Sequence, residues 1–131
     1  MNSRVERTKS ILVIDDEPMV LQLLKKILGS EGYDVNLAAD GVYGMALYRE
    51  KKPDLFLLDI MMPGPDGYQV IESIRQDGGV PVIMITGRRD RDSLQQALNS
   101  GADDYIRKPF RPLELMARVR SKLRRAEMRV S

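Results

Sequence analysis

Short continuous apolar runs alternate with longer amphipathic stretches along nearly the whole chain. The runs have the length of strands and lack the apolar/polar alternation of a half-exposed strand, so they predict strands buried on both faces. They occupy residues 10–14, 34–39, 54–59, 80–86 and 103–107. The stretches between them place apolar residues at a helical period, and Gly and Pro residues separate the two kinds of segment. The pattern therefore predicts consecutive strand–helix units.

The expected helices follow each of these strands in turn. They are predicted over residues 19–28, 40–52, 68–76 and 90–100, with a last helix that Pro112 opens. Asp40 is expected to cap the second helix, because a carboxylate at this position accepts a backbone N–H of the first turn. In the last helix, we expect one apolar face to pack against the sheet, formed by Leu113, Met116, Val119 and Leu123.

Strands without a wet face, separated by crossover helices, are typical of a parallel sheet with helices on both faces. The predicted fold class is therefore a doubly wound α/β sandwich, and 131 residues suffice for one such domain with a full core. We assign residues 10–125 to this domain, residues 1–9 to an N-terminal extension, and residues 126–131 to a C-terminal tail or the start of a linker.

The composition narrows the chemistry that this domain can carry. The chain has no Cys and no His, which excludes thiol nucleophiles, Cys/His zinc sites, imidazole catalysis and disulfides. Residues 105–131 carry nine basic and two acidic side chains, whereas residues 11–104 carry nine basic and sixteen acidic ones. No apolar run approaches the ~20 residues that span a bilayer, and the first residues lack a signal-peptide segment, so we expect a cytoplasmic protein without a membrane partner.

Polar side chains follow the ends of four predicted strands. They are Asp15, Asp16 and Glu17 after the first strand, Asp59 at the end of the third, Thr86 at the end of the fourth and Lys108 after the fifth. Because the carboxyl ends of parallel strands meet at one edge of the sheet, we expect these side chains to converge. Two carboxylates ~4 Å apart repel by roughly 4 kcal/mol at an effective dielectric near 20, and one ammonium does not balance three of them. Oxygen ligands without His or Cys favour Mg²⁺ or Mn²⁺, so the pattern predicts a site for one of these ions.

The same carboxylates have a plainer explanation, because Asp and Glu are common at helix N-termini and on surface turns. Polar signals at four strand ends, each after a buried run, favour the metal site over isolated caps. A nucleotide site is not expected, since the loop after the first strand reads DDEP and the chain contains neither GxGxxG nor GxxxxGK[ST].

Four segments form a recognisable combination. They are residues 11–17 (ILVIDDE), 54–67 (DLFLLDIMMPGPDG), 81–86 (PVIMIT) and 101–110 (GADDYIRKPF). Together and in this order they resemble the receiver domain of two-component response regulators, and the match covers about residues 10–125. The resemblance implies a flavodoxin-like α/β fold, with a five-stranded parallel sheet in the order 2-1-3-4-5 and five helices on both of its faces.

The resemblance implies that Asp59 is the phosphoacceptor, which takes a phosphoryl group from a histidine of a sensor histidine kinase. Asp16 and Asp59 would bind Mg²⁺ directly, Asp15 would act through water, and Met61 would offer its backbone carbonyl. Lys108 would pair with the phosphoryl oxygens and stabilise their charge. On this interpretation the protein is a signalling switch and not an enzyme that turns over an external substrate.

Two further features of the resemblance concern the switch. Thr86 and Tyr105 match the switch pair: the Thr86 hydroxyl would bind the phosphoryl group in one state only, and Tyr105 would turn into the space it leaves. Lys108–Pro109 matches the family's cis-peptide site, which would aim Lys108 at the phosphoryl group. Gly87 stands where the family often has Ala.

The last predicted helix resembles that of the winged-helix DNA-binding subfamily of these regulators. In that subfamily, the fourth helix, the fifth strand and the fifth helix form a symmetric homodimer through charge pairs. The matching charged positions are Asp103, Asp104, Glu114, Arg118 and Arg125. Leu94 occupies the position where the subfamily usually has a basic partner for Glu114. The 131 residues hold no winged-helix pattern, so we expect transcription regulation, and any contact with DNA, only through an attached or partner output domain.

Three other functions compete with the phosphorylation switch. A Mg²⁺-dependent phosphatase with Asp59 as nucleophile would need an acid–base carboxylate two residues later, where the chain has Met61. A non-phosphorylated interaction module on the same fold usually lacks one of the acidic residues, all of which are present here. Direct DNA binding by the basic last helix is weakly supported, because its apolar face must pack on the sheet.

Overall fold

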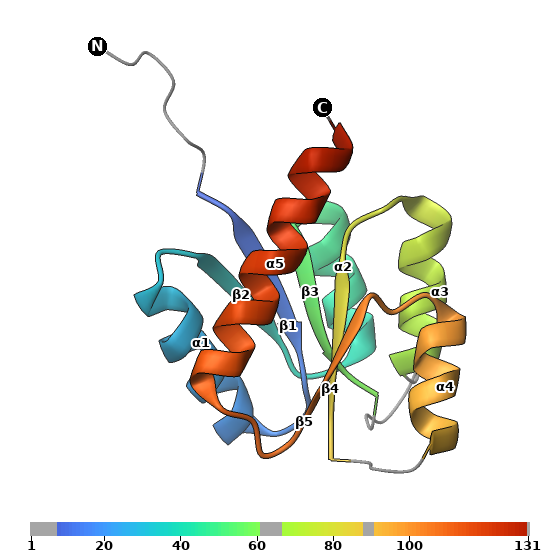
Figure 1. The fold of residues 1–131 in the computed structure, drawn as a ribbon, viewed down its shortest axis with the longest axis horizontal. Helices are drawn as coiled ribbons and strands as arrows, with labels where there is room; N and C mark the ends of the chain where they lie inside the picture. Colours follow the sequence, from blue (N-terminus) through green and yellow to red (C-terminus); the bar gives the residue numbers. More distant parts are fainter. Residues whose placement is uncertain (1–7, 61–66, 88–90, 131) are drawn as a thin grey trace.

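The computed structural model describes residues 8–60, 67–87 and 91–130. Its centre is a five-stranded parallel sheet in the order β2-β1-β3-β4-β5 (Figure 1). The strands are β1 (Ser10–Ile14), β2 (Asp34–Ala38), β3 (Leu55–Asp59), β4 (Val82–Thr86) and β5 (Asp104–Arg107). The predicted α/β class, the parallel sheet and the strand order are confirmed.

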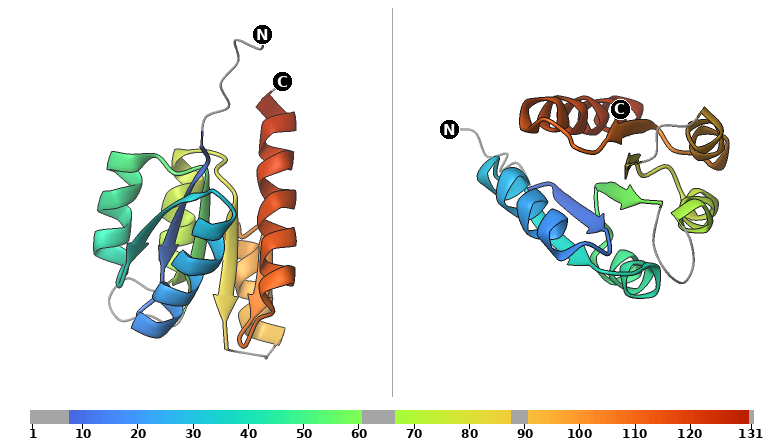
Figure 2. Two further views of the ribbon diagram at one scale, coloured as in Figure 1. Left: turned by 90° about the vertical axis from the view of Figure 1, so that its left-hand side faces the viewer. Right: turned by 90° about the horizontal axis from the view of Figure 1, so that it is seen from below.

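The helices of the described residues cover both faces of this sheet (Figure 2). They are α1 (Pro18–Ser30), α2 (Gly41–Lys51), α3 (Gly67–Asp77), α4 (Arg91–Ser100) and α5 (Pro112–Val130). Buried side chains of α1 and α5 form one core cluster with the sheet, and those of α2, α3 and α4 form another on the opposite face. The predicted helices are therefore present, and both faces are covered as expected.

Strand burial follows the apolar runs of the sequence. Every residue of β3 and β4 is buried, whereas the edge strands β2 and β5 are partly exposed. Because successive side chains of a strand point to opposite faces, one apolar run supplies both cores. In β3, Leu55 and Leu57 join the cluster of α1 and α5, and Phe56 and Leu58 join the cluster on the other face.

Local signals set the ends of two helices. Asp40 caps α2, since its Oδ1 accepts a hydrogen bond from the Tyr43 N–H at 2.8 Å, as the sequence predicts. Gly101 follows α4 with a φ of +113°, a backbone conformation that residues other than glycine rarely adopt. A Cβ at Gly101 would also lie 2.6 Å from Cγ of Arg75, so this turn needs a glycine for two reasons.

The expected apolar face of the last helix is partly wrong. Leu113 is 76% exposed, whereas Leu115 is fully buried with Val119 and Leu123. Residues 115, 119 and 123 repeat every four positions and share one face of the helix, and residue 113 falls about 200° away from residue 115. The true stripe therefore starts two residues later than the pattern suggested, with Met116 at its half-buried margin.

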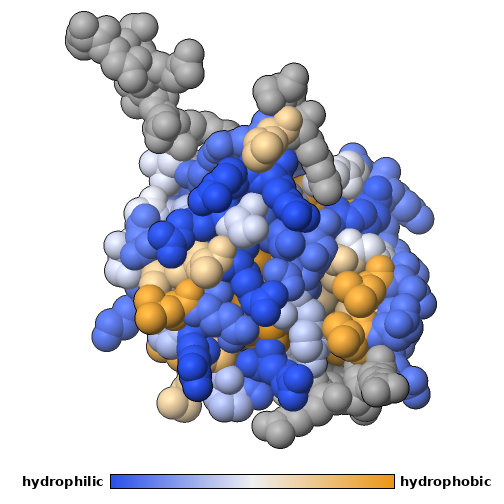
Figure 3. All heavy atoms as spheres, in the orientation of Figure 1, coloured by the Kyte–Doolittle hydropathy of each residue, from blue (hydrophilic) through white to orange (hydrophobic). Residues whose placement is uncertain are grey.

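Helix α5 continues through Val130, beyond the position where the tail was expected to begin. Its last turns rise past the edge of the sheet, on the side where β1 begins (Figure 1). There, Lys9 pairs with Glu127 at 2.9 Å and joins the start of β1 to α5. The surface over α5 is mostly hydrophilic (Figure 3). Neither α5 nor any other helix in the described ranges is long and apolar enough to cross a membrane.

Candidate functional site

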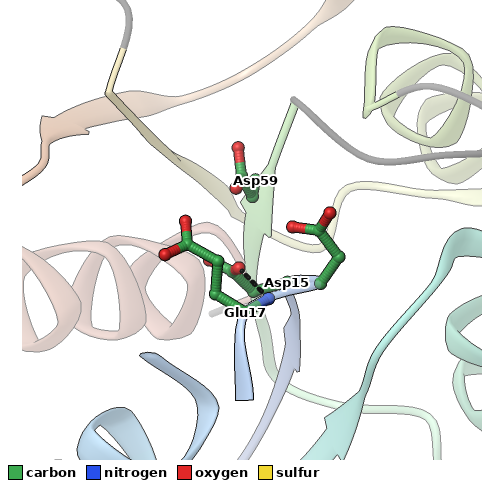
Figure 4. A group of neighbouring side chains, drawn as sticks. Asp15, Glu17 and Asp59 are labelled. Carbon is green, nitrogen blue, oxygen red and sulfur yellow. Dashed lines mark hydrogen bonds between the residues drawn. The ribbon is translucent and has the colours of Figure 1, made fainter. Parts of the chain in front are cut away.

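The carboxyl ends of the two central strands bring four carboxylates together. Asp15 directly follows β1 and Asp59 ends β3, which lies beside it, and only 1% and 3% of these residues are exposed. With Asp16 and Glu17, each offers an oxygen atom, and these atoms all lie within 4.8 Å of one another. Figure 4 shows Asp15 and Glu17 at the end of β1 beside Asp59 on β3. The predicted convergence of these acidic residues is thus observed.

The turn after β1 holds Asp15 in place. Its backbone N–H donates to the Ala38 carbonyl at 3.1 Å and so extends the pairing of β1 with β2 by one residue. Its Oδ1 accepts a hydrogen bond from the Glu17 N–H at 2.9 Å (Figure 4). Pro18 then starts α1 at a position where the backbone N–H has no partner within the helix, so the N–H that proline lacks is not needed. The sequence D-D-E-P therefore makes a tight corner, with one carboxylate buried and two exposed.

Lys108 reaches the carboxylates from β5. Its Nζ donates to Asp59 Oδ2 at 3.0 Å and to Glu17 Oε1 at 2.9 Å, and it lies 2.9 Å from Asp15 Oδ2. The peptide bond between Lys108 and Pro109 is cis, as the resemblance implied. Burial alone would lower the pKa of the Lys108 ammonium, but the contacts with Glu17, Asp15 and Asp59 outweigh it and raise the pKa above its usual value.

The electrostatics of Asp15 favour a further cation. Burial raises the pKa of its carboxyl, and the nearby Asp59 raises it again, while the Glu17 N–H and Lys108 partly offset both effects. Lys108 pairs with Asp15 Oδ2 by charge and not in hydrogen-bond geometry, and this buried oxygen has no hydrogen-bond partner among the described residues. An incompletely neutralised, all-oxygen cluster of this kind suits Mg²⁺ or Mn²⁺.

Thr86 and Tyr105 lie on the same face of the sheet. Thr86 is fully buried at the end of β4, and Tyr105 in β5 is half-buried. Tyr105 is paired in register with Met84, two residues before Thr86, and packs against the core cluster that contains Met84. Because residues two apart in a strand share a face, both side chains belong to the side covered by α4.

Four of the five charged positions expected at a dimer interface have partners within the chain. Arg118 pairs with Asp104 at 2.6 Å and with Glu114 at 3.3 Å. Asp103 forms an ion pair with Arg75 of α3 and accepts the Val82 N–H at 2.8 Å. Leu94 is half-buried on α4, and Arg125 is exposed on α5. The structure thus places these residues on neighbouring elements and shows internal partners for four of them.

Sequence reasoning misses one contact within the site and one network at the opposite edge of the sheet, where β4 and β5 begin. Glu17 was recognised as part of the acidic run, but its hydrogen bond to Lys108 joins positions 91 apart and has no local signal. Arg75 was not singled out, yet its guanidinium donates to the Gly101 and Val80 carbonyls and to Asp103. Met61, which the resemblance assigned to the metal site, lies outside the described residues.

Known proteins share this fold and much of this sequence. Residues 11–120 match the family model described as response regulator receiver domain. The chain is 47% identical over 117 residues to the DNA-binding response regulator MtrA of Mycolicibacterium smegmatis, covering 89% of this chain and 51% of that protein. It is 46% identical over 119 residues to the probable transcriptional regulator ycf27 of Porphyridium aerugineum, covering 91% of this chain and 50% of that protein. The chain therefore spans about half the length of these curated relatives.

Solved structures agree with the sequence relatives. A CheY-like response regulator receiver domain protein of Methanospirillum hungatei superposes with a TM-score of 0.90 at 35% identity, over 94% of this chain and 99% of that one. The BeF3-activated N-terminal receiver domain of Klebsiella pneumoniae RstA superposes with a TM-score of 0.85 at 34% identity, over 88% of this chain and 99% of that one.

Proposed function

Because the chain belongs to the receiver domain family of two-component response regulators, we propose that Asp59 accepts a phosphoryl group from a histidine of a sensor histidine kinase in a Mg²⁺-dependent reaction. The observation that carries this proposal is the position of Asp59. Its carboxylate is buried at the end of a central strand, contacts Lys108 and lies within 4.8 Å of the other carboxylates.

The acidic cluster is a suitable site for Mg²⁺. Asp16 and Asp59 would bind the ion directly and Asp15 through water, and Met61 would add a backbone carbonyl. The buried Asp15 Oδ2, which pairs with Lys108 but accepts no hydrogen bond from the described residues, and the purely oxygen donor set support this assignment. When bound, Mg²⁺ neutralises charge on the phosphoryl oxygens and on the carboxylates that face them.

The residues of this chain have separate tasks in the transfer. An Asp59 carboxylate oxygen attacks phosphorus in line, so an O–P bond forms while the N–P bond of the kinase phosphohistidine breaks. The electron pair of that bond stays on the imidazole nitrogen. The Lys108 ammonium, already 3.0 Å from Asp59 Oδ2, stabilises the negative charge on the transferred phosphoryl oxygens.

We assign the response of the protein to Thr86 and Tyr105. The Thr86 hydroxyl, at the end of the strand beside β3, would bind the phosphoryl group in the phosphorylated state only. Tyr105 lies on the same face two register positions away and would turn inward as Thr86 moves. A ligand shifts an equilibrium only by its different affinity for the two states, and this hydroxyl contact supplies that difference.

The output is proposed to be transcription regulation through a DNA-binding domain outside these residues, with residues 10–125 as the receiver domain. The relatives that the chain half covers are named as DNA-binding or transcriptional regulators. Phosphorylation would favour a homodimer through α4, β5 and α5, using the charged residues of that surface: Asp103, Asp104, Glu114, Arg118 and Arg125. A signalling switch of this kind is not expected to turn over an external substrate.

The direct test is the mass of the intact protein after incubation with acetyl phosphate, with Mg²⁺ or with EDTA. The wild type is compared with Asp59→Asn and with Asp34→Asn, an exposed aspartate at the start of β2. We expect one phosphoryl adduct that requires Mg²⁺ and Asp59 and is unaffected in Asp34→Asn. Rapid release of phosphate without an adduct would indicate a hydrolase or a very short-lived phosphoprotein. Neither adduct nor release would favour an interaction module instead.

A further inference from the structure

Glu17 contacts Lys108 although its backbone position suits a different task. It is the N-cap residue of α1, yet its side chain makes no capping hydrogen bond. Instead, Oε1 accepts a hydrogen bond from Lys108 Nζ at 2.9 Å. The Glu17 N–H donates to Asp15 Oδ1 and fixes the backbone. With 59% of its side chain exposed, Glu17 approaches Lys108 from the solvent side of the site.

The Lys108 ammonium lies between this exposed carboxylate and two buried ones. Asp15 and Asp59 contact it from the interior at 2.9 and 3.0 Å. A divalent ion held by Asp59 directly and by Asp15 through water would repel an ammonium that stayed in contact with both carboxylates. The long, flexible lysine stem lets the ammonium withdraw, and Glu17 is the partner that it already has on the outer side.

We propose that Glu17 is a positioning residue, which holds the Lys108 ammonium on the solvent side when a divalent cation replaces it at Asp15. This role deepens the proposed function and rests on it, because it assumes that the acidic cluster binds Mg²⁺. Glu17 acts through Lys108 and does not need to touch the ion. Its loss returns Lys108 to the buried carboxylates, where the ammonium competes with Mg²⁺, and also removes one negative charge near the ion. Both effects weaken Mg²⁺ binding.

The affinity of the full chain for Mg²⁺ is measured as the gain in free energy of urea unfolding on adding MgCl₂ at constant ionic strength. The variants are Glu17→Gln, Glu17→Asp and, as a matched control, Glu31→Gln, an exposed glutamate at the other end of α1. We expect the Mg²⁺ dissociation constant of Glu17→Gln to rise about three- to tenfold, the range for one lost charge contact in a half-exposed setting. The control should match the wild type.

Glu17→Asp separates positioning from simple charge. Aspartate keeps the negative charge but is one methylene shorter, so it cannot reach the Lys108 ammonium with the backbone held by Asp15. We expect its Mg²⁺ affinity to fall below that of the wild type but by less than in Glu17→Gln, because only the contact with Lys108 is lost and the negative charge stays. A Glu17→Asp variant that binds Mg²⁺ like the wild type would overturn the proposal, whether or not Glu17→Gln is weakened.

A Lys108→Gln background gives the second test. Without the ammonium, Glu17→Gln should weaken Mg²⁺ binding by a smaller factor than it does with Lys108 present, because only the loss of its negative charge near the ion remains. An undiminished effect in this background would overturn the positioning role.

Labelling by acetyl phosphate gives an independent readout: the half-maximal Mg²⁺ concentration should rise in Glu17→Gln, with full labelling at saturating Mg²⁺. A wild type that gives neither adduct nor phosphate release at saturating Mg²⁺ refutes the phosphoacceptor function, whereas unshifted variants of a labelled wild type refute only the role of Glu17.

Discussion

Replacing Lys108 with methionine removes the ammonium that neutralises the buried end of the site. Asp15 and Asp59 then face each other with oxygens within 4.8 Å, a repulsion of at least roughly 3 kcal/mol at an effective dielectric near 20. Removing one partner of a buried ion pair typically costs about 3–5 kcal/mol, and the open side of the site reduces this penalty. We expect Lys108→Met to lose about 2–4 kcal/mol of unfolding free energy at pH 7.5 without Mg²⁺.

The loss should depend on pH and on Mg²⁺ in a definite direction. The pKa of Asp15 is already raised by burial, and removing Lys108 takes away a contact that lowers it. At pH values between the ordinary pKa of 3.8 and the raised pKa of Asp15 in the folded variant, the folded state holds a proton that the unfolded state has released. The free energy of unfolding of the variant therefore falls as the pH rises through this range, so the loss should be smaller at pH 5 than at pH 7.5. Mg²⁺ should also reduce it by supplying positive charge.

The assay is urea unfolding of wild type and Lys108→Met at pH 5 and pH 7.5, each in EDTA and in MgCl₂. Lys26→Met, which replaces an exposed lysine of α1, controls for the loss of a surface charge and should change stability by less than about 0.5 kcal/mol. In the wild type, the stabilising contribution of Lys108 persists up to the ordinary lysine pKa of 10.5 and is lost above it, since its folded-state pKa is raised. An equal loss in all four conditions would refute the charge-balance reasoning.

Two further substitutions, each with a matched control, test the packing of α2 on β1 and the Arg75 network where β4 and β5 begin, both by urea unfolding. Gly44→Ala would place a Cβ 2.4 Å from Ile14 Cδ1 and should lower the free energy of unfolding by about 1–3 kcal/mol. Its control, Gly29→Ala in α1, meets nothing within 4 Å and should raise the free energy of unfolding by about 0.5–1 kcal/mol. Equal effects of the two substitutions would contradict the observed close approach of Gly44 to Ile14. Arg75→Met removes a cation that donates to two carbonyls and one carboxylate and should lower the free energy of unfolding by about 2–4 kcal/mol. Its control, Arg49→Met, replaces an exposed arginine and should lower the free energy of unfolding by less than about 0.5 kcal/mol. Similar values for the two would show that the Arg75 network is not stabilising.

The elements of this fold were predictable because each strand is a buried apolar run bounded by turn residues. Residues 55–58 are fully apolar and fully buried. Because neither face of this strand meets solvent, its apolar run in the sequence is uninterrupted. Helix phase was harder to predict, since α5 presents apolar residues around more than one side. Leu113 and Leu115 are equally apolar, and only packing against the sheet decides which is buried. Their difference, 76% against 0% exposed, therefore comes from tertiary structure.

The site was predictable wherever strand order alone brings residues together. Asp15 directly follows β1 and Asp59 ends β3, and these strands are parallel neighbours, so the two side chains must lie close together. The partners of Lys108 could be anticipated only in part, because a long side chain can reach several carboxylates and the backbone does not select among them. The Asp103–Arg75 pair had no sequence signal at all: it joins α3 to the loop before β5, and such contacts depend on the angle at which a helix lies on the sheet.

The distribution of charge in the site suggests why its parts are arranged as they are. A buried carboxylate that must react at phosphorus has to be ionised, yet two buried carboxylates side by side disfavour ionisation. Lys108 reduces this conflict but leaves Asp15 with a raised pKa and one oxygen without a hydrogen-bond partner among the described residues. Two buried carboxylates and one ammonium thus leave the interior of the site short of one positive charge. A bound divalent cation would supply that positive charge, whereas a phosphoryl group on Asp59 would add negative charge, so under the proposed function the phosphoryl oxygens need both the cation and Lys108 as partners.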